Sequence, residues 1–513
     1  MKRFAANTCD KYVCFILLLC ICSVLRADVD AEITPITLTP VDSFNLQIDA
    51  QPGPAYLVTS LASPAQNWFA GSFAALPTDR KTTIGLSLKR KEGSAATAQV
   101  SKWQGLRPVM TYADPSRSEC YECFAKDEQG RWRSLDPLKR GEERFAGTGK
   151  VPEQRAMPAA LAEGFLSADG RGWTPWREVD AVEVLPALNI FRITQRFQAP
   201  SAAVAMRIPC PYSYQQAVIS RLQDARLPGV YVDTLGVTPG GRALQIIRIE
   251  DEDTPLNMAQ RKTILVVGRE HATEAASSWV AWGLLNQLIS NTDAARAMRK
   301  GLTWLIVPIE DPDGSANALF DRLTNRFCGV ADPDTPPEVF LYARYFNDYI
   351  YTGKSLDIAV SLHNVEANEC ANIYCPFTDA LRVTLATSVT QNLYGALRRY
   401  AYTFDEKSQP WDVGSVDFRL FGWCASRFST LDLAYEVNDR YPQHRLALPE
   451  LQQVGAVLGE TLATWCAGEE GQRWHLRVSK YLQVKRLERA AYFERAGYSP
   501  AERTKFDLVI RAF

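Results

Sequence analysis

The sequence predicts an α/β protein, with an N-terminal antiparallel β-sandwich domain followed by an α/β/α domain built on a mixed sheet. The chain has 513 residues, and a single hydrophobic core stops growing at roughly 250–300 residues, so two domains are expected. Short alternating segments broken by Gly, Pro, Asp and Ser fill residues 45–210. From residue 211 onward, compact apolar segments alternate with helical patterns, which is typical of a buried sheet with helical connections.

The composition argues against several classes of partner. The chain carries 57 basic and 58 acidic residues, a net charge of -1. This balance indicates neither nucleic acid nor an anionic membrane as a partner. No apolar run in the body of the chain reaches the roughly 20 residues of a transmembrane helix. A stable membrane span is therefore not expected in the mature chain.

Residues 1–27 are predicted to be a signal peptide. Lys2, Arg3 and Lys11 precede an apolar run over 12–25, and Ala27 offers a small residue for cleavage. This pattern indicates export, so the protein is predicted to be periplasmic or secreted. An uncleaved membrane anchor is the alternative.

The cysteines beyond this leader fit an oxidising compartment. Of the 12 cysteines, eight lie after residue 27, an even number that is compatible with disulfides. Cys120 and Cys123 form a Cys-x-x-Cys pair, which is read either as a local disulfide or as two plain thiols. Their connectivity stays open.

The β-rich region follows a polar entry linker over 28–44. Its clearest strand signals are 82–88, 182–184 and 189–197. The second domain is predicted over 211–468, and a charged helical tail over 469–513. This second domain is expected to contain four buried strands, at 263–268, 302–309, 357–362 and 431–435. A helix is expected at 275–289 and a closing helix at 449–465.

The histidines point to a metal site. The chain has only 4 of them. His271 follows the strand at 263–268, and Glu274 lies three residues further on, so a turn or first helical step brings both side chains to one side. His363 ends another predicted strand, and ligands bind at the carboxyl ends of strands in open α/β sheets. Two histidines and one glutamate form a catalytic type of zinc set, so one Zn2+ per chain is predicted.

Glu436 closes a third apolar strand, at 431–435. Burial would raise the pKa of its carboxyl toward the working pH, while a nearby metal dication would oppose that shift. It is predicted to act as the general base toward the water that zinc activates and then as proton donor to the leaving amine. A surface ion pair is the alternative role.

These features together resemble the M14 zinc carboxypeptidase family, and most closely its cytosolic-carboxypeptidase-like branch. The similarity rests on 269–274 (REHATE), the Pro-Asp-Gly turn at 312–314, and the two strand ends at His363 and Glu436. It also rests on 211–214 (PYSY) and 105–109 (GLRPV) in the region before the second domain. The resemblance covers roughly 45–466 and implies a zinc peptidase fold and activity.

The chain also departs from this family pattern. The family's arginine that polarises the substrate carbonyl is best matched by Arg322, and its Asn-Arg pair that binds the C-terminal carboxylate by Asn325 and Arg326. The aspartate that precedes that pair is absent, so Asp311 or Asp321 would have to orient a zinc histidine instead. Arg322 and Arg326 are alternatively surface charges, and no tyrosine that covers the substrate can be placed before Glu436.

The predicted activity is hydrolysis of C-terminal peptide bonds. Weakening of the carboxylate clamp leaves a zinc amidase or deacylase as the alternative, acting on cell-wall peptides or acylated amino acids. A third hypothesis is a non-catalytic module that binds a partner through its β-domain and basic tail. The expected substrate is thus a peptide or an amide, and its side-chain preference stays open.

Overall fold

The computed structural model describes most of residues 177–497 and, before residue 177, mainly strand segments. The leader and residues beyond 499 lie outside the described part. Within 177–497 the residues outside it are 189, 200–201, 211, 252–259, 272–273, 291, 318–321, 324–325, 328–334, 366–370, 376–379, 398–408, 411–418 and 440–447.

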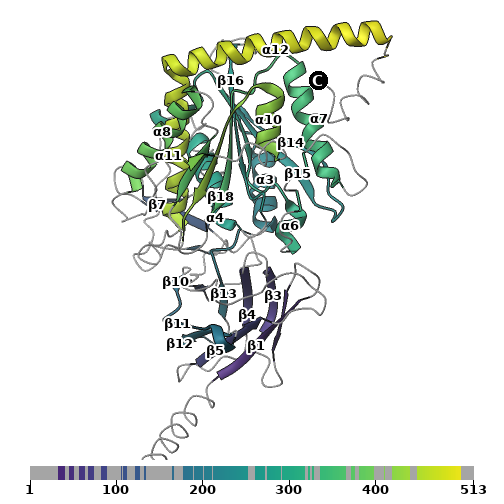
Figure 1. Ribbon diagram of the computed structural model, residues 1–513. Coiled ribbons are helices and arrows are strands. Elements are labelled where there is room, and N and C mark those ends of the chain that lie inside the picture. The colour runs from purple at the N-terminus through teal and green to yellow at the C-terminus, as the bar shows by residue number, and fades with distance from the viewer. Residues whose placement is uncertain are drawn as a thin grey trace, which may run out of the picture.

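The centre of the molecule is an eight-stranded mixed sheet, as the sequence predicts (Figure 1). Its strand order is β14-β15-β17-β16-β18-β21-β19-β20. The pairs β17–β16, β16–β18 and β18–β21 are parallel, whereas β14–β15, β15–β17 and β19–β21 are antiparallel. These strands span Val230–Val237 (β14), Ala243–Glu250 (β15), Lys262–Gly268 (β16), Leu302–Val307 (β17), Ile358–Asn364 (β18), Asn372–Cys375 (β19), Gln409–Pro410 (β20) and Leu431–Val437 (β21).

The three central strands are apolar because helices cover both faces of the sheet. Every residue of β16, β17 and β18 is buried, so no polar face alternates along them. In Figure 1 one layer holds α4, α8 and α11, and the other holds α3, α7 and α10. The helices span Tyr212–Ala225 (α3), Ala275–Leu288 (α4), Asp293–Arg299 (α5), Pro312–Asn317 (α6), Pro337–Tyr351 (α7), Ala380–Leu397 (α8), Leu420–Phe428 (α10) and Leu448–Ala467 (α11).

Two glycines allow α4 and α11 to pack backbone against backbone. A Cβ on Gly283 of α4 would collide with the backbone of Gln452, and a Cβ on Gly455 of α11 would collide with that of Val280. Helix α4 begins directly after Glu274. The position of the first metal-ligand candidates therefore depends on this contact.

Replacement of Gly455 by alanine is expected to destabilise the protein. The added methyl group has no space between two backbones, and overpacking of a core costs typically about 1–3 kcal/mol. The matched control is Gly395→Ala on the exposed side of α8, where nothing lies within 4 Å of the added Cβ. That change should be neutral or stabilise by about 0.5–1 kcal/mol, because alanine favours helix over glycine. Thermal unfolding of both variants measures the difference; equal midpoints would contradict the close packing.

A long C-terminal helix crosses one end of the sheet (Figure 1). This helix, α12 (Glu469–Ala496), buries Trp474, His475, Val478 and Leu482 against the body of the protein. His475 Nδ1 lies 2.7 Å from Asp357 Oδ1, and Trp474 donates its indole N–H to Asp357 O. Among the described residues, no helix has the length and apolarity needed to cross a membrane.

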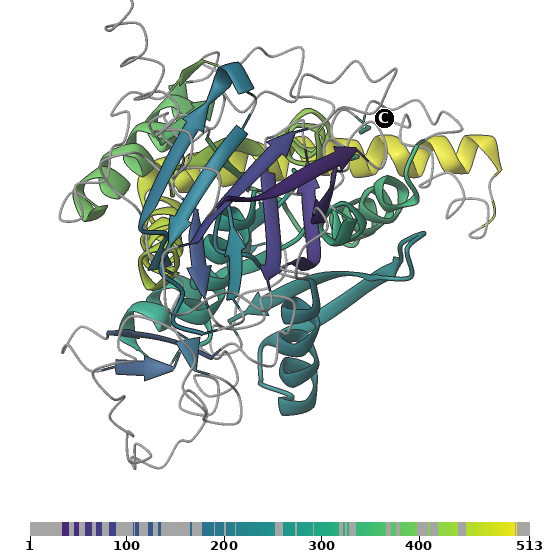
Figure 2. The same cartoon turned by 90° about the horizontal axis from the view of Figure 1, so that it is seen from below.

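The N-terminal region is rich in strands, but the predicted β-sandwich is not confirmed. Its strands form one ten-stranded sheet, β10-β6-β13-β4-β3-β2-β1-β5-β12-β11, and a separate three-stranded sheet, β8-β7-β9. The larger sheet is not purely antiparallel, because β1 and β5 pair in parallel. These strands lie toward the viewer in Figure 2.

The first strand lies in a segment that the sequence analysis assigns to an entry linker, 28–44. Strand β1 pairs there with both β2 and β5. The strands of this region span Ile33–Pro40 (β1), Leu46–Ala50 (β2), Leu57–Ser63 (β3), Trp68–Phe73 (β4), Thr82–Leu88 (β5), Val109–Thr111 (β6), Glu122–Lys126 (β7), Trp132–Ser134 (β8), Phe165–Leu166 (β9), Arg177–Glu178 (β10), Ala181–Leu185 (β11), Ile190–Gln195 (β12) and Ala202–Ala205 (β13).

Candidate active site

The carboxyl ends of four neighbouring parallel strands carry the candidate site. His271 follows β16, and Glu310 follows β17. His363 and Glu436 are the next-to-last residues of β18 and β21. In the register of β18 and β21, His363 lies directly opposite Glu436. Because residues paired in this way share a face of the sheet, their side chains are on the same side.

The structure brings His271, Glu274 and His363 together. The Nδ1 atom of His271 lies 2.8 Å from a carboxylate oxygen of Glu274, and the Nδ1 atom of His363 lies 3.1 Å from the other oxygen. The two Nδ1 atoms are 3.3 Å apart. All three residues are buried or nearly so, and they are the only group of this kind found among the described residues.

This donor set fits a zinc ion. Two nitrogens about 2.1 Å from one tetrahedral zinc are roughly 3.4 Å apart, which matches the 3.3 Å between the two Nδ1 atoms. Two imidazoles and a carboxylate are also the ligand types of catalytic zinc sites. His271, Glu274 and His363 would therefore hold the metal.

The electrostatics of Glu274 agree with a carboxylate that stays ionised. Burial by itself would raise its pKa, but the charges and hydrogen bonds of His271 and His363 outweigh burial and hold the pKa well below its usual range. An ionised carboxylate is the form that binds a cation.

A strained turn presents His271 to the site. Arg269 has a φ of 65°, in the left-handed region that costs a non-glycine residue energy. Its backbone N–H donates to Ser277 Oγ at 3.0 Å, and its buried guanidinium donates to Cys210 O at 2.6 Å. These two contacts stabilise the turn between β16 and α4.

Asn364 and Arg207 join the segments that carry the site residues. Asn364 Nδ2 donates to Val437 O at 3.1 Å, and its Oδ1 accepts from Ser277 N at 3.3 Å, so one amide links β18 to β21 and to α4. Arg207, from the segment after β13, donates to Val365 O at 2.6 Å. Its guanidinium also lies 3.6 Å from Asp439. The loops after His363 and Glu436 are thus held by one buried arginine.

Glu436 has the environment expected of a base. Burial raises the pKa of its carboxyl to about 7, even though His363, His271 and Arg419 favour the charged form. Its strand places it next to His363 without making it part of the group of three residues. The assignment as general base stays a prediction that this geometry supports.

Two residues that the sequence analysis did not select contact the far side of His363. Its Nε2 atom lies 3.0 Å from Ser361 Oγ and 3.5 Å from a carboxylate oxygen of Glu270. A partner on this second nitrogen fixes the tautomer and orientation of a ligating imidazole. In the sequence, only their closeness to the ligand candidates could have indicated these two residues. Ser361 lies two residues before His363, and Glu270 directly precedes His271.

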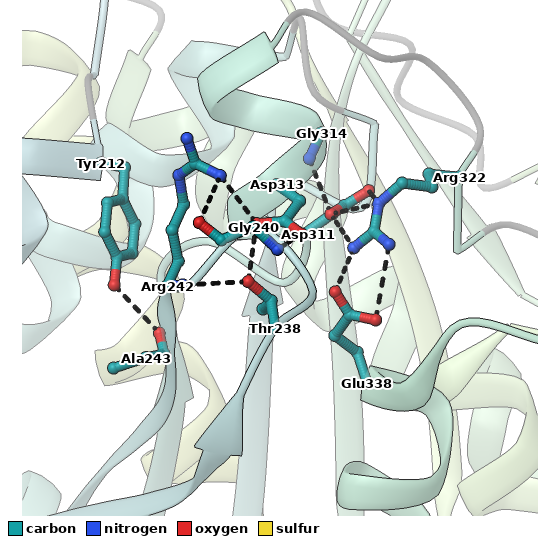
Figure 3. Close-up of polar contacts among 10 residues, drawn as sticks. All are labelled: Tyr212, Thr238, Gly240, Arg242, Ala243, Asp311, Asp313, Gly314, Arg322 and Glu338. Carbon is teal, nitrogen blue, oxygen red and sulfur yellow. Dashed lines mark hydrogen bonds and ion pairs between the residues drawn. The ribbon is translucent and has the colours of Figure 1, made fainter.

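Arg322 is bound to two buried carboxylates (Figure 3). Its Nε and Nη2 atoms donate to Asp311 at 3.0 and 2.6 Å, and its Nη2 also donates to Glu338. Asp311 and Glu338 are both completely buried. Asp311 therefore forms an ion pair with Arg322, whereas the sequence analysis offered Asp311 as a partner of a zinc histidine. Asp321, the other residue offered for that role, lies outside the described part.

The Pro-Asp-Gly turn is anchored to a neighbouring hairpin (Figure 3). Asp313 accepts hydrogen bonds from Thr238 Oγ1 at 2.6 Å, from Gly240 N at 2.8 Å and from Arg242 Nη1 at 2.8 Å. These bonds hold α6 against the turn between β14 and β15. Asp313 thus has a structural role.

The structure describes one of the two residues that are predicted to bind the C-terminal carboxylate of the substrate. Asn325 lies outside the described residues. Arg326 is half-buried, and its backbone N–H donates to Leu323 O at 3.1 Å. Carboxylate binding by this pair stays a prediction.

Part of the chain is similar in sequence to known proteins. A sequence profile described as zinc carboxypeptidase matches residues 217–326, a segment that includes His271 and Glu274. Mouse cytosolic carboxypeptidase 6 is 30% identical over 106 residues, which cover 20% of this chain and 20% of that protein. Human cytosolic carboxypeptidase 1 is 27% identical over 168 residues, which cover 30% and 14%. Residues 217–326 thus match the M14 zinc carboxypeptidase family. The chain is similar to the cytosolic carboxypeptidases within that family.

The fold of the chain is similar to that of solved carboxypeptidases over most of its length. A metallo-carboxypeptidase from Burkholderia cenocepacia superposes with a TM-score of 0.56 at 16% identity, covering 84% of this chain and 95% of that one. A metallo-carboxypeptidase from Pseudomonas aeruginosa has a TM-score of 0.51 at 16% identity, covering 83% and 97%. At this identity the likeness shows the fold alone. In sequence, the chain spans about a fifth of the length of the first curated relatives it matches.

The predicted export of this protein is wrong. The relatives matched are named cytosolic carboxypeptidases, which points to the cytosol. A short apolar run is not specific to signal peptides, because runs of about 10–14 residues also form buried helices; here the run lies outside the described residues. Three cysteines of the described part, Cys210, Cys424 and Cys466, are buried free thiols. The even cysteine count is therefore no evidence that these three form disulfides.

Proposed function

We propose that this chain is a zinc-dependent carboxypeptidase that hydrolyses the C-terminal peptide bond of its substrates. The observation that carries the proposal is the convergence of His271, Glu274 and His363 at zinc-ligand spacing beside Glu436. The match of residues 217–326 to a zinc carboxypeptidase profile supports the same chemistry. Because the curated relatives are matched over only part of their length, the activity of the whole protein is our inference.

The residues of the chain have distinct tasks in this reaction. A bound zinc would polarise the scissile carbonyl and lower the pKa of water to roughly 7. Glu436 accepts a proton from the attacking water and returns it to the leaving amine nitrogen, a role that suits a buried carboxyl with a raised pKa. Ser361 and Glu270 hold the imidazole of His363 from its far side.

One observation favours a second candidate, a zinc amidase or deacylase. Strict release of C-terminal residues needs a group that binds the terminal carboxylate, and the pair matched to that role, Asn325 and Arg326, lacks the aspartate that precedes it in the family pattern. Arg322, the match for the arginine that polarises the substrate carbonyl, is also already bound to Asp311 and Glu338. An enzyme without that clamp would hydrolyse internal or capped amide bonds with the same metal and the same base.

A matched pair of peptides separates these activities. Zinc-loaded protein is assayed with one peptide in two forms, a free C-terminal acid and a C-terminal amide, and released amino acid is quantified. A carboxypeptidase should cleave the acid and leave the amide, whereas an amidase should treat both alike. Zinc content is measured on the same sample: one equivalent per chain is expected. A protein that binds no stoichiometric metal and cleaves neither form would be a non-catalytic binding module.

A further inference from the structure

The outward face of α12 carries exposed apolar side chains. Five large hydrophobic residues are exposed in the described part of the chain, and three of them lie on this one helix. Leu476 is 59% exposed, Val484 53% and Leu487 64%. The other two belong to β14. Single exposed apolar residues are normal on a protein surface, whereas a contiguous group of them marks a contact surface.

The three residues are aligned along the helix. Leu476, Lys480, Val484, Leu487 and Ala491 follow one another at intervals of four, four, three and four residues, and all five are exposed. Intervals of three and four keep side chains on one face of a helix and are typical of a helix–helix seam. We call these five residues the α12 stripe. At 1.5 Å per residue the stripe is about 22 Å long.

The α12 stripe points away from the body of the protein. The buried residues Trp474, Val478 and Leu482 recur every four positions and pack α12 onto the sheet. Each of them precedes a stripe residue by two positions, which corresponds to about 200° around the helix. In Figure 1 α12 runs across the top of the view, outside the other labelled elements. A second helix therefore has access to the whole length of the stripe.

The charges at the two ends of the α12 stripe are opposite. Arg473 lies three residues before Leu476, and Glu494 lies three residues after Ala491. Both charged side chains are exposed. An antiparallel copy of the helix that sets Leu476 against Ala491 also sets Arg473 against Glu494, at both ends of the pair. A parallel copy would bring like charges together. The stripe is thus complementary to itself in one orientation, which a two-fold symmetric interface requires.

We propose that the α12 stripe is a dimerisation surface on which two copies of this chain pair through antiparallel α12 helices. In this pairing Leu487 of each copy packs against the aliphatic stem of Lys480 of the other, whose ammonium group reaches water at the rim. The two Val484 side chains lie beside the two-fold axis. Burial of the apolar side chains stabilises the pair, and the ion pairs at its ends fix its orientation.

The active site stays open in this dimer. Trp474 and His475 of α12 contact Asp357, which directly precedes β18. The helix therefore crosses the amino ends of the strands, whereas His363 and Glu436 lie at the carboxyl ends. We expect kcat to be the same in the monomer and the dimer. The dimer does not depend on the proposed function, and each can fail without the other.

Leu487→Lys tests the interface in the whole chain. The variant places two lysines opposite each other in the seam, and loss of a central apolar contact should raise the Kd of the dimer about 30-fold or more. Val237→Lys on β14 is the matched control, because Val237 is 61% exposed and lies outside the stripe. Sedimentation equilibrium measures Kd for both variants and for wild type, which should form a species of twice the 57.3 kDa chain mass.

A charge reversal tests the antiparallel orientation. Arg473→Glu brings two acidic side chains together at each end of the pair, so it should weaken the dimer about 3- to 10-fold. Arg473→Glu combined with Glu494→Arg restores opposite charges and should restore the affinity. Rescue by the second substitution reports contact between the two copies, which a change in the stability of one chain would not produce.

Three results would overturn the proposal. The first is a wild-type protein that sediments as a single chain at about 100 µM, a concentration at which even a weak dimer forms. The second is a dimer whose Kd is unchanged by Leu487→Lys, or is raised equally by Val237→Lys. The third is a double charge variant that binds no better than Arg473→Glu alone. Thermal unfolding of each variant confirms that it is folded, since every substituted side chain is exposed.

Discussion

Glu436→Gln is expected to reduce kcat about 10²- to 10⁴-fold, the usual contribution of a positioned general base. Glutamine keeps the shape of the side chain but cannot accept the proton of the attacking water. Glu436 is paired with His363 across β18 and β21 and is not part of the group of His271, Glu274 and His363. The variant should therefore retain its zinc. Steady-state kinetics and zinc content of the purified variant measure the two effects separately.

The control for this change is Glu494→Gln. Glu494 is exposed on α12, so the same loss of charge should leave kcat unaltered. A Glu436→Gln variant with full activity would remove Glu436 from the role of base. A variant that loses both activity and zinc would instead make Glu436 a residue that supports the metal.

His363→Ala is expected to lose zinc binding at micromolar metal and, with it, hydrolysis. Removal of a partner that only orients a ligand costs about 10- to 100-fold in metal affinity, and removal of a ligand should cost more. The vacated position lies between Glu274, at 3.1 Å, and Ser361, at 3.0 Å, which leaves His271 and Glu274 as the remaining donors. Metal titration monitored by calorimetry gives the affinity directly.

His475→Gln is the matched control for a histidine. His475 is hydrogen-bonded to Asp357 and belongs to α12, so its replacement should affect stability and leave zinc stoichiometry at one. If His363→Ala binds zinc as tightly as wild type, the metal centre assigned to His271, Glu274 and His363 is incorrect.

The strands and helices of the second domain could be predicted because their sequence patterns are local. The apolar runs at 263–268, 302–309, 357–362 and 431–435 correspond to β16, β17, β18 and β21. The helix at 275–289 corresponds to α4 and the one at 449–465 to α11. Strands buried on both faces have continuous apolar sequences, which few other structures produce. The N-terminal region lacked such a signal, and its alternating strands did not show how they would pair.

The sequence by itself determined the metal-ligand candidates and the residue predicted to be the base. Histidine is rare in this chain, and the ends of parallel strands meet at one edge of a sheet, so His271, His363 and Glu436 were expected to converge. Only the tertiary structure decided the roles of the arginines. Arg322 forms ion pairs with Asp311 and Glu338. Arg419 forms an ion pair with Glu270, which lies 149 positions earlier in the sequence. Which charges pair depends on three-dimensional distance and burial, and neither can be read from spacing along the chain.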